Sequence, residues 1–546
     1  MNSIAFISKD CHQNEAVNQG MCRLNTTVDF EEALGELGAD ALRGLIRAIL
    51  PELDERARRR IIDAIVQRAA RSDSGWAPAR PTPDAASRVV KFAEIARRNG
   101  YAEPSEVDAA LREGVNAFLA KDYGSACDLF GALLPLLAEG EIDLGQDELV
   151  DDVLDVDLAE CATAYVVARY MTAEPSQRAT VVRAAIGEVD SVGLFWEPLR
   201  EMERVAVEPL AGFDEFLPRW RTLIEAHRDE RERDWLTNDD RWLREVIGRT
   251  EGAGGLAKLA RTTGRTEDFR AWCELLVAAK DWKAALAAYR ESADTVADDA
   301  YARGEFLDGI GLAARELGRK DLPAHLERAW REAPTLLRLR RWFGAAKTKS
   351  VLRKRAAQAL EGRPSKAPRQ LALIYLVLGD LASAAQLLAR APGLGWSQAE
   401  HPGHLLFPIF QQLLGGAEPP APNRFAAISA RDTDVDEMDW ILGDEDSMRL
   451  DAPEITDILH LAGIAQGVTE KARTAMLRGL RKAAEKRVAG VTKKQRRRYY
   501  AHAAELVAIC VALDPGPKAA NWVAGIRETY SRYPAMQREF DDHLSA

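Results

Sequence analysis

Residues 371–392 read LALIYLVLGDLASAAQLLARAP, and this stretch decides the fold class. An apolar run ends at Gly379 and Asp380, and a second apolar run follows directly. The second run places Ala384 and Leu388 four residues apart, which is the spacing of one helix face. Aspartate is favoured just before a helix, because its carboxylate accepts hydrogen bonds from the first backbone amides. The stretch therefore predicts two helices joined by a tight turn.

Two other stretches repeat this pattern. Residues 114–130 read GVNAFLAKDYGSACDLF, and residues 280–289 read KDWKAALAAY. In each, an aspartate precedes an aromatic residue, and an alanine follows three residues after that aromatic, at Ala126 and Ala285. A small residue on a helix face allows a second helix to approach closely. The three stretches therefore predict helical hairpins with close crossings.

This pattern resembles the tetratricopeptide repeat, in which a small alanine and a bulky residue alternate across paired helices. The resemblance covers about a third of the chain, and its units are irregularly spaced. Tyr123 and Trp282 stand 159 residues apart, whereas Trp282 and Leu381 stand 99 apart. Only the second spacing is near a multiple of the ~34-residue repeat. The resemblance implies an irregular α-solenoid with an extended interaction surface, but it assigns no peptide-binding residues.

Composition places the chain among globular proteins with a sizeable core. Of its 546 residues, 47% are hydrophobic and 29% are charged, and the formal net charge is −11. This balance argues against nucleic-acid binding over the whole surface, although it allows one basic patch. The six cysteines form no close metal-binding pair, and no apolar run reaches the ~20 residues of a membrane helix. We therefore expect a cytoplasmic protein without a membrane partner.

Charge and helix-breaking residues divide the chain into five expected segments. Residues 1–26 form a polar extension that we expect to be disordered, and residues 27–84 contain a helical pair and a linker. Residues 85–414 form the repeat domain, 415–451 a Pro-rich acidic linker, and 452–546 a basic helical domain. The predicted fold is thus all-α: an irregular solenoid that resembles tetratricopeptide repeats, with a smaller helical C-terminal domain.

The strongest charge feature lies in the expected C-terminal domain. Residues 471–498 include twelve lysines and arginines and one acidic residue. Such a run suits contacts with phosphate groups, beside tyrosines that can stack on bases. It equally suits pairing with the acidic residues of 432–457, or a solvated helix face. The residues that we single out for anion or partner binding are Arg478, Arg481, Lys482, Lys493, Lys494, Arg496, Arg497, Arg498, Tyr499 and Tyr500.

The linker 415–451 supports a further hypothesis. Glycines and prolines interrupt helix over 415–422, and eleven acidic residues against one arginine follow over 432–457. In layout only, a folded body, an acidic hinge and a basic C-terminal piece resemble the substrate or regulator proteins of CRISPR-associated caspase-like protease systems. That resemblance implies cleavage of the hinge by a partner protease. The hinge or cleavage positions that we single out are Gly415, Pro420, Arg424, Asp434, Met438 and Asp446.

No catalytic motif accompanies these features. The sequence lacks a phosphate-binding loop, a GxSxG turn, an HExxH zinc motif and a dinucleotide-binding glycine pattern. His401 and His404 form the one close histidine pair, without a nearby third ligand. We expect no catalytic residue, cofactor or metal, and we interpret the chain as an interaction scaffold or regulatory protein of a bacterial pathway. The expected partner is another protein, such as a protease or regulatory factor; weak nucleic-acid binding is the alternative.

Overall fold

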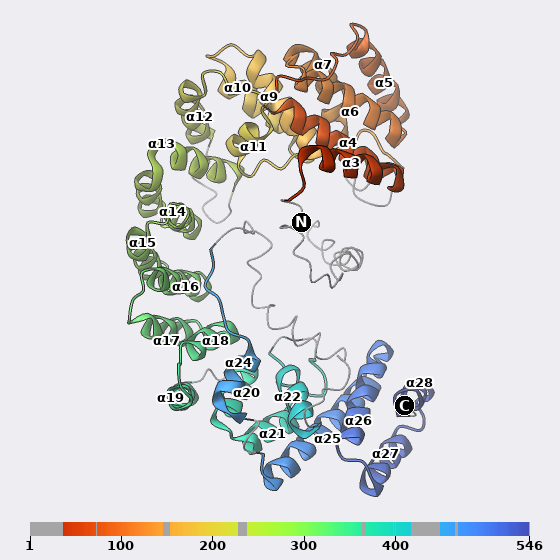
Figure 1. Cartoon of the computed structure of the whole chain (residues 1–546), viewed down its shortest axis with the longest axis vertical. Coiled ribbons are helices and arrows are strands. Elements are labelled where there is room, and N and C mark those ends of the chain that lie inside the picture. Colours follow the sequence, from red (N-terminus) through yellow and green to blue (C-terminus); the bar gives the residue numbers. More distant parts are fainter. Residues whose placement is uncertain are drawn as a thin grey trace. The chain divides into compact units, whose positions relative to one another are not determined.

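The computed structural model shows an all-α protein, which confirms the predicted fold class (Figure 1). The residues that it describes are 36–72, 74–145, 153–227, 237–362, 367–396, 398, 400–415, 448–464 and 468–544. Within these ranges there are 24 α-helices and two 3-10 helices, and the one β-type contact is an isolated bridge between Tyr101 and Asp143. The predicted disordered extension 1–26 lies outside the described residues.

The helices gather into two compact units. Unit 1 is Met1–Val246 and unit 2 is Ile247–Ala546. The division between Val246 and Ile247 falls within α13 (Asn238–Thr263). Further along the same helix, Gly252 has a φ of 62° and interrupts the helical backbone. The other helices of unit 1 are α3 (Ala39–Ile49), η1 (Leu50–Glu52), α4 (Glu55–Ala70), α5 (Ala85–Asn99), α6 (Pro104–Leu119), α7 (Tyr123–Ala138), α9 (Leu158–Thr172), α10 (Arg178–Val189), α11 (Pro198–Val205) and α12 (Phe213–His227).

Unit 2 continues with helices that contact their neighbours in chain order, from α14 to α18. Its helices are α14 (Thr266–Ala278), α15 (Trp282–Thr295), α16 (Ala300–Glu316), α17 (Leu322–Glu332), α18 (Leu336–Gly344), α19 (Lys349–Glu361), α20 (Pro368–Leu378), α21 (Leu381–Arg390), α22 (Gly403–Gly415), α24 (Ile455–Ala462), α25 (Glu470–Lys493), η4 (Arg497–Tyr499), α26 (Tyr500–Leu513), α27 (Pro517–Thr529) and α28 (Pro534–Leu544).

The turn identified in the sequence has one geometry in all three stretches. The turns are Lys121–Asp122, Lys280–Asp281 and Gly379–Asp380. The first residue of each has a positive φ, of 57°, 55° and 76°, which ends the preceding helix. The aspartate amide donates to the carbonyl five residues earlier, and its carboxylate accepts from the amide three residues later. Both helix ends are thus capped within two residues.

The alanines of these hairpins are completely buried. Ala126, Ala285 and Ala384 are 0% exposed, as predicted for residues at helix crossings. In two of the three hairpins the bulky residue four positions later packs where a neighbouring helix has a glycine: Phe130 against Gly114, and Tyr289 against Gly309 of α16. A Cβ on Gly114 of α6 would lie 2.6 Å from the Phe130 ring of α7. The small residues therefore set the distance between adjacent helices.

The described contacts place the C-terminal helices in the same core as the preceding ones, and this differs from the predicted boundary at 415–451. One hydrophobic cluster runs from Leu312 in α16 to Phe540 in α28. Within it, α25 packs on α21 and α22, and α24 packs on α18, α19 and α20. A linker-like composition shows that a segment is not core, but it does not show that the flanking parts fold separately.

Candidate functional site

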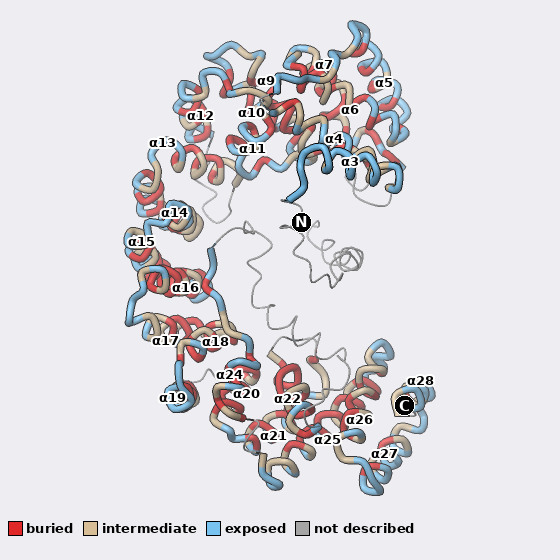
Figure 2. The backbone as a smooth tube through the Cα atoms, viewed as in Figure 1, coloured by how far each residue is buried: buried red, intermediate tan, exposed pale blue. Residues whose placement is uncertain are grey.

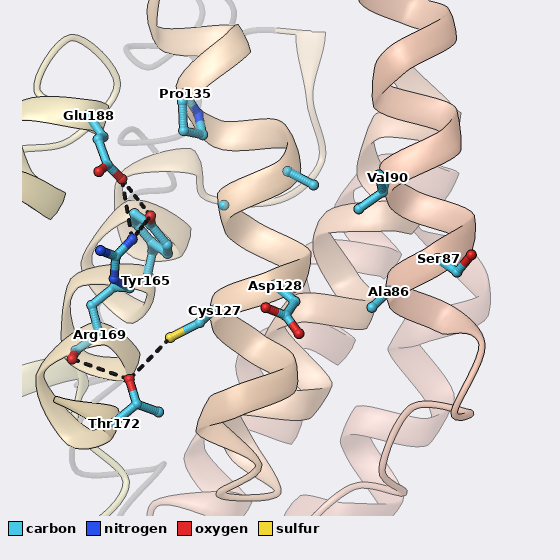
Figure 3. A pocket seen from close by; sticks show the side chains of 12 residues that line it. Ala86, Ser87, Val90, Cys127, Asp128, Pro135, Tyr165, Arg169, Thr172 and Glu188 are labelled. Carbon is cyan, nitrogen blue, oxygen red and sulfur yellow. Dashed lines mark hydrogen bonds and ion pairs between the residues drawn. The ribbon is translucent and has the colours of Figure 1, made fainter.

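A groove opens in unit 1, where α7 lies between α5 and α9 (Figure 3). Its volume is about 830 Å³, and one residue of α10 completes its lining. The lining residues are Ala86, Ser87 and Val90 of α5, Cys127, Asp128, Gly131, Ala132 and Pro135 of α7, Tyr165, Arg169 and Thr172 of α9, and Glu188 of α10. None of them was singled out from the sequence.

The middle of the groove is open because α7 carries small residues there. A Cβ on Gly131 would lie 3.5 Å from the Tyr165 ring, and Ala132 follows with a single methyl group. Pro135 lies inside the same helix and has no amide hydrogen. It therefore cannot donate the helical hydrogen bond to the carbonyl of Gly131, four residues earlier. The groove thus combines open space with a backbone carbonyl whose usual helical donor is missing.

Three side chains form a hydrogen-bonded wall on one side of the groove (Figure 3). Tyr165 donates from its hydroxyl to Oε2 of Glu188 at 2.5 Å, and Arg169 donates from Nη1 to that hydroxyl at 2.6 Å. The same Arg169 nitrogen lies 3.6 Å from Oε2 of Glu188. Burial, together with the bond to Glu188, raises the pKa of Tyr165, so the phenol stays protonated at neutral pH. We call Tyr165, Arg169 and Glu188 the polar wall.

The one thiol of the groove is not activated as a nucleophile. Sγ of Cys127 lies 3.6 Å from the Thr172 hydroxyl, and burial raises the pKa of the thiol. A reactive cysteine needs a lowered pKa, because the thiolate is the nucleophile. The arrangement therefore favours binding through fixed hydrogen-bonding groups over covalent chemistry.

Five of the predicted anion-binding residues lie together at the end of α25. Gln495, with φ 51°, turns the chain between α25 and η4. All five are exposed, and none pairs with an acidic side chain within the part of the chain that the structure describes. We call Lys493, Lys494, Arg496, Arg497 and Arg498 the basic turn.

Two other cations of the run have acidic partners, although Lys482 remains exposed. Arg481 pairs with Asp514 at 2.8 Å, and Lys482 pairs with Glu485 at 2.9 Å, whereas Arg478 is exposed. Sequence reasoning missed Arg487, which is 4% exposed and donates to the Gly393 carbonyl at 3.3 Å. Composition alone cannot separate the buried Arg487 from exposed cations such as Lys482 and Lys493, because all three lie in α25.

The two tyrosines do not form the stacking surface that we predicted. Tyr500 is 3% exposed in the core, so its prediction as a binding residue is wrong. Tyr499 is half-buried, and the guanidinium carbons of Arg487 and Arg498 lie 5.1 and 4.7 Å from its ring centroid. Cation–π contacts thus already engage the ring. The adjacent tyrosines point to different environments because successive helical residues lie about 100° apart.

The acidic segment 432–457, which we considered as an internal partner of the basic run, and the hinge 415–451 lie mostly outside the described residues. Among the described acidic residues, Asp451 pairs with Arg315 at 2.8 Å rather than with the basic turn. Gly415 is the last residue of α22. The remaining hinge positions, which lie outside the described residues, are Pro420, Arg424, Asp434, Met438 and Asp446.

The histidine pair is buried beside a tryptophan. His401 and His404 are each 4% exposed, and their ring centroids lie 4.5 and 5.8 Å from that of Trp396. The described residues contain no group of three or more His, Cys, Asp or Glu side chains that could hold a metal ion. Burial lowers the pKa of His401 to about 4. The ring is therefore neutral at physiological pH.

Comparisons with family models, with curated proteins and with solved structures give no match to this chain. The helices that the structure describes include none with the length and apolar character needed to cross a bilayer.

Proposed function

We propose that the chain is a non-catalytic binding protein that holds a segment of a partner protein in the groove of unit 1. The polar wall carries this proposal. Tyr165 is 1% exposed and holds Arg169 and Glu188 in place, so these two half-exposed charged groups face a partner without first having to be ordered. Preorganised groups lose less conformational entropy on binding than free side chains do.

The opposite side of the groove suits apolar contact. Val90 of α5 is 40% exposed, and Ala86, Ala132 and Pro135 also line the groove. A partner segment with an apolar anchor and charged or amide groups would contact both sides at once. Such a mixture of a small apolar area and a few placed polar groups is typical of peptide-binding grooves.

The repeated hairpins support the same proposal. We infer that they form an irregular solenoid, in which each hairpin packs on its neighbours and leaves helix faces open for partners. The common turn geometry and the chain-order contacts of α14–α18 support this arrangement. In such a fold a binding surface needs no enclosed cavity.

Filling the groove tests the proposal. Ala132→Trp would place an indole in the groove, whereas Ala109→Trp adds the same group to an exposed position on α6. The full chain and both variants are used to capture partners from a lysate of the source cells, with quantification by mass spectrometry. We expect a partner that the wild type and Ala109→Trp retain and Ala132→Trp loses. Equal capture by all three would contradict binding in the groove.

The basic turn supports a second function, which is binding of a polyanion such as nucleic acid. Its five cations are exposed and lack acidic partners among the described residues, while neighbouring cations are engaged internally. Phosphate contacts of this kind weaken steeply as salt rises. Fluorescence anisotropy with single-stranded oligonucleotides should therefore detect binding at low salt that is lost near physiological salt.

A charge-matched pair of variants tests whether the basic turn is responsible. Arg496→Glu with Arg497→Glu should abolish low-salt binding. Arg353→Glu with Lys354→Glu changes the net charge equally at exposed positions on α19 and should have a smaller effect. Equal losses would show non-specific attraction by overall charge.

A further inference from the structure

Residues 449–454, with the sequence RLDAPE, form a non-helical segment that crosses two helices of unit 2, and we call this segment the strap. The strap leads directly into α24, which begins at Ile455. In Figure 1 it is part of the blue trace that passes α16 and α18 on the way to α24. Most of its residues are exposed or partly exposed, in contrast to the buried faces of the helices beside it (Figure 2).

Two apolar side chains of the strap pack against glycines of these helices. Leu450 is 8% exposed, and a Cβ on Gly311 of α16 would lie 3.0 Å from its Cδ2. A Cβ on Gly344, the last residue of α18, would lie 2.7 Å from Cδ of Pro453 and would overlap the proline ring. The absence of a side chain at the two glycines therefore leaves room for the leucine and the proline.

Two arginines of the same helices hold the backbone of the strap. Arg315 of α16 donates from Nη2 to the Arg449 carbonyl at 3.3 Å, and its Nη1 pairs with Asp451 at 2.8 Å. Arg340 of α18 is 3% exposed and donates from Nε to the Pro453 carbonyl at 3.0 Å. Backbone contacts that provide affinity, combined with side-chain anchors that provide specificity, are typical of proteins that bind extended peptides.

The strap and α24 are attached to the rest of unit 2 by different contacts. Helix α24 packs on α18, α19 and α20 through its own buried residues. The strap is held by the contacts described above, and the side chain of Asp451 remains 91% exposed. The strap can therefore leave while α24 stays in place. Arg340 would then lose the acceptor of its Nε, and a buried donor without an acceptor is unfavourable. Exchange for another segment that supplies a carbonyl is thus favoured over simple release.

The four residues that receive the strap, which we call the docking surface, are Gly311, Arg315, Arg340 and Gly344. We propose that the docking surface binds an extended segment of a partner protein with the pattern Leu-Asp-x-Pro, and that the strap covers it as an internal competitor. The partner's leucine and proline would lie over the two glycines, and its aspartate would pair with Arg315. None of these residues lines the groove of unit 1, so the proposal does not depend on the proposed function.

Fluorescence anisotropy of the full chain with a labelled peptide of the sequence 448–455 tests the proposal. The strap belongs to the same chain, so its effective concentration is on the order of 1 mM, and the free peptide competes poorly with it. Leu450→Ala removes the buried anchor of the strap and should tighten peptide binding about tenfold or more. Asp451→Arg removes only an exposed ion pair and should tighten it about twofold to fivefold, without touching the core.

The control variant is Asp298→Arg, which makes the same charge change at an exposed turn after α15 and should leave the affinity unchanged. A peptide with alanine in place of its leucine and its proline should not bind to any of these chains. Circular dichroism establishes that each variant is folded, and Asp451→Arg decides the outcome if Leu450→Ala is not. A folded variant of the strap that binds the peptide no tighter than the wild type would overturn the proposal.

Charge exchange locates the bound peptide. Arg315→Glu, added to the strap-weakened chain, should reduce the affinity for the original peptide and create a preference for a peptide whose aspartate is replaced by arginine. An unchanged order of preference would show that the peptide binds elsewhere, and would also overturn the proposal.

Discussion

Replacing Gly479 with alanine measures how closely α25 packs on α21. A Cβ at this position would lie 2.8 Å from the backbone oxygen of Ala385 and 3.2 Å from its Cα. Backbone atoms cannot rotate away, so the helices would have to separate, and overpacking of this kind costs about 1–3 kcal/mol. Alanine in turn stabilises a helix interior by about 0.5–1 kcal/mol relative to glycine. The packing cost and the gain in helix preference have opposite signs, so the net change in the free energy of unfolding of this single variant does not give the packing cost.

A matched glycine isolates the packing contribution. Gly525 lies in α27, and a Cβ there would meet nothing within 4 Å. Gly525→Ala should gain the helix preference without steric cost, so it should stabilise unit 2. The difference between the two variants then equals the packing cost at Gly479, about 1–3 kcal/mol. Urea unfolding followed by circular dichroism measures both values. Equal stabilities within about 0.5 kcal/mol would refute the close contact of α25 with α21.

The other predictions concern the linker, the turns and the buried histidine. Limited proteolysis should cut first within 415–451, and the two pieces should stay together in gel filtration until denaturant is added, because they share a core; separation without denaturant would contradict the shared core. Asp281→Ala should cost about 0.5–2 kcal/mol in urea unfolding, because it removes the cap bond to the Ala284 amide, whereas Asp281→Asn keeps a capping oxygen and should cost less; equal losses would exclude capping as the cause. Burial lowers the folded-state pKa of His401 to about 4, so stability should be full above the ordinary pKa of 6.5 and fall by on the order of 3 kcal/mol as the pH drops from 6.5 to 4. His401→Gln should flatten that pH dependence, and an unchanged slope would assign it to other groups.

Local rules predicted the hairpins well because the relevant contacts are local. Asp122, Asp281 and Asp380 bond amides only three residues away, so their role is visible in the sequence. The domain boundary was harder to predict because it depends on distant contacts. Residues after the acidic segment contact helices that come much earlier in the chain. For example, Arg340 of α18 donates to the Pro453 carbonyl at 3.0 Å. No sequence spacing indicates such a pairing.

The candidate sites show the same difference between local contacts, which the sequence predicts, and distant contacts, which it does not. The charge run predicted the basic turn, because Lys493, Lys494 and their neighbours are consecutive in the chain. It could not show that Arg487 is buried. The groove was not predicted, because its polar wall joins Tyr165 of α9 to Glu188 of α10. The available sequence signal was the spacing of Tyr165, Arg169 and Thr172 along one face of α9, which is equally typical of ordinary packing.

Site-specific photo-crosslinking from the groove tests the proposed function most directly. A photoreactive amino acid at Val90, which is 40% exposed on the groove's α5 side, should form a covalent adduct with a partner protein. The same group at Ala109 on α6 should not, and adding Ala132→Trp should suppress the adduct from position 90. An adduct that forms equally from both positions, or that persists with the groove filled, would contradict the claim that the groove holds the partner.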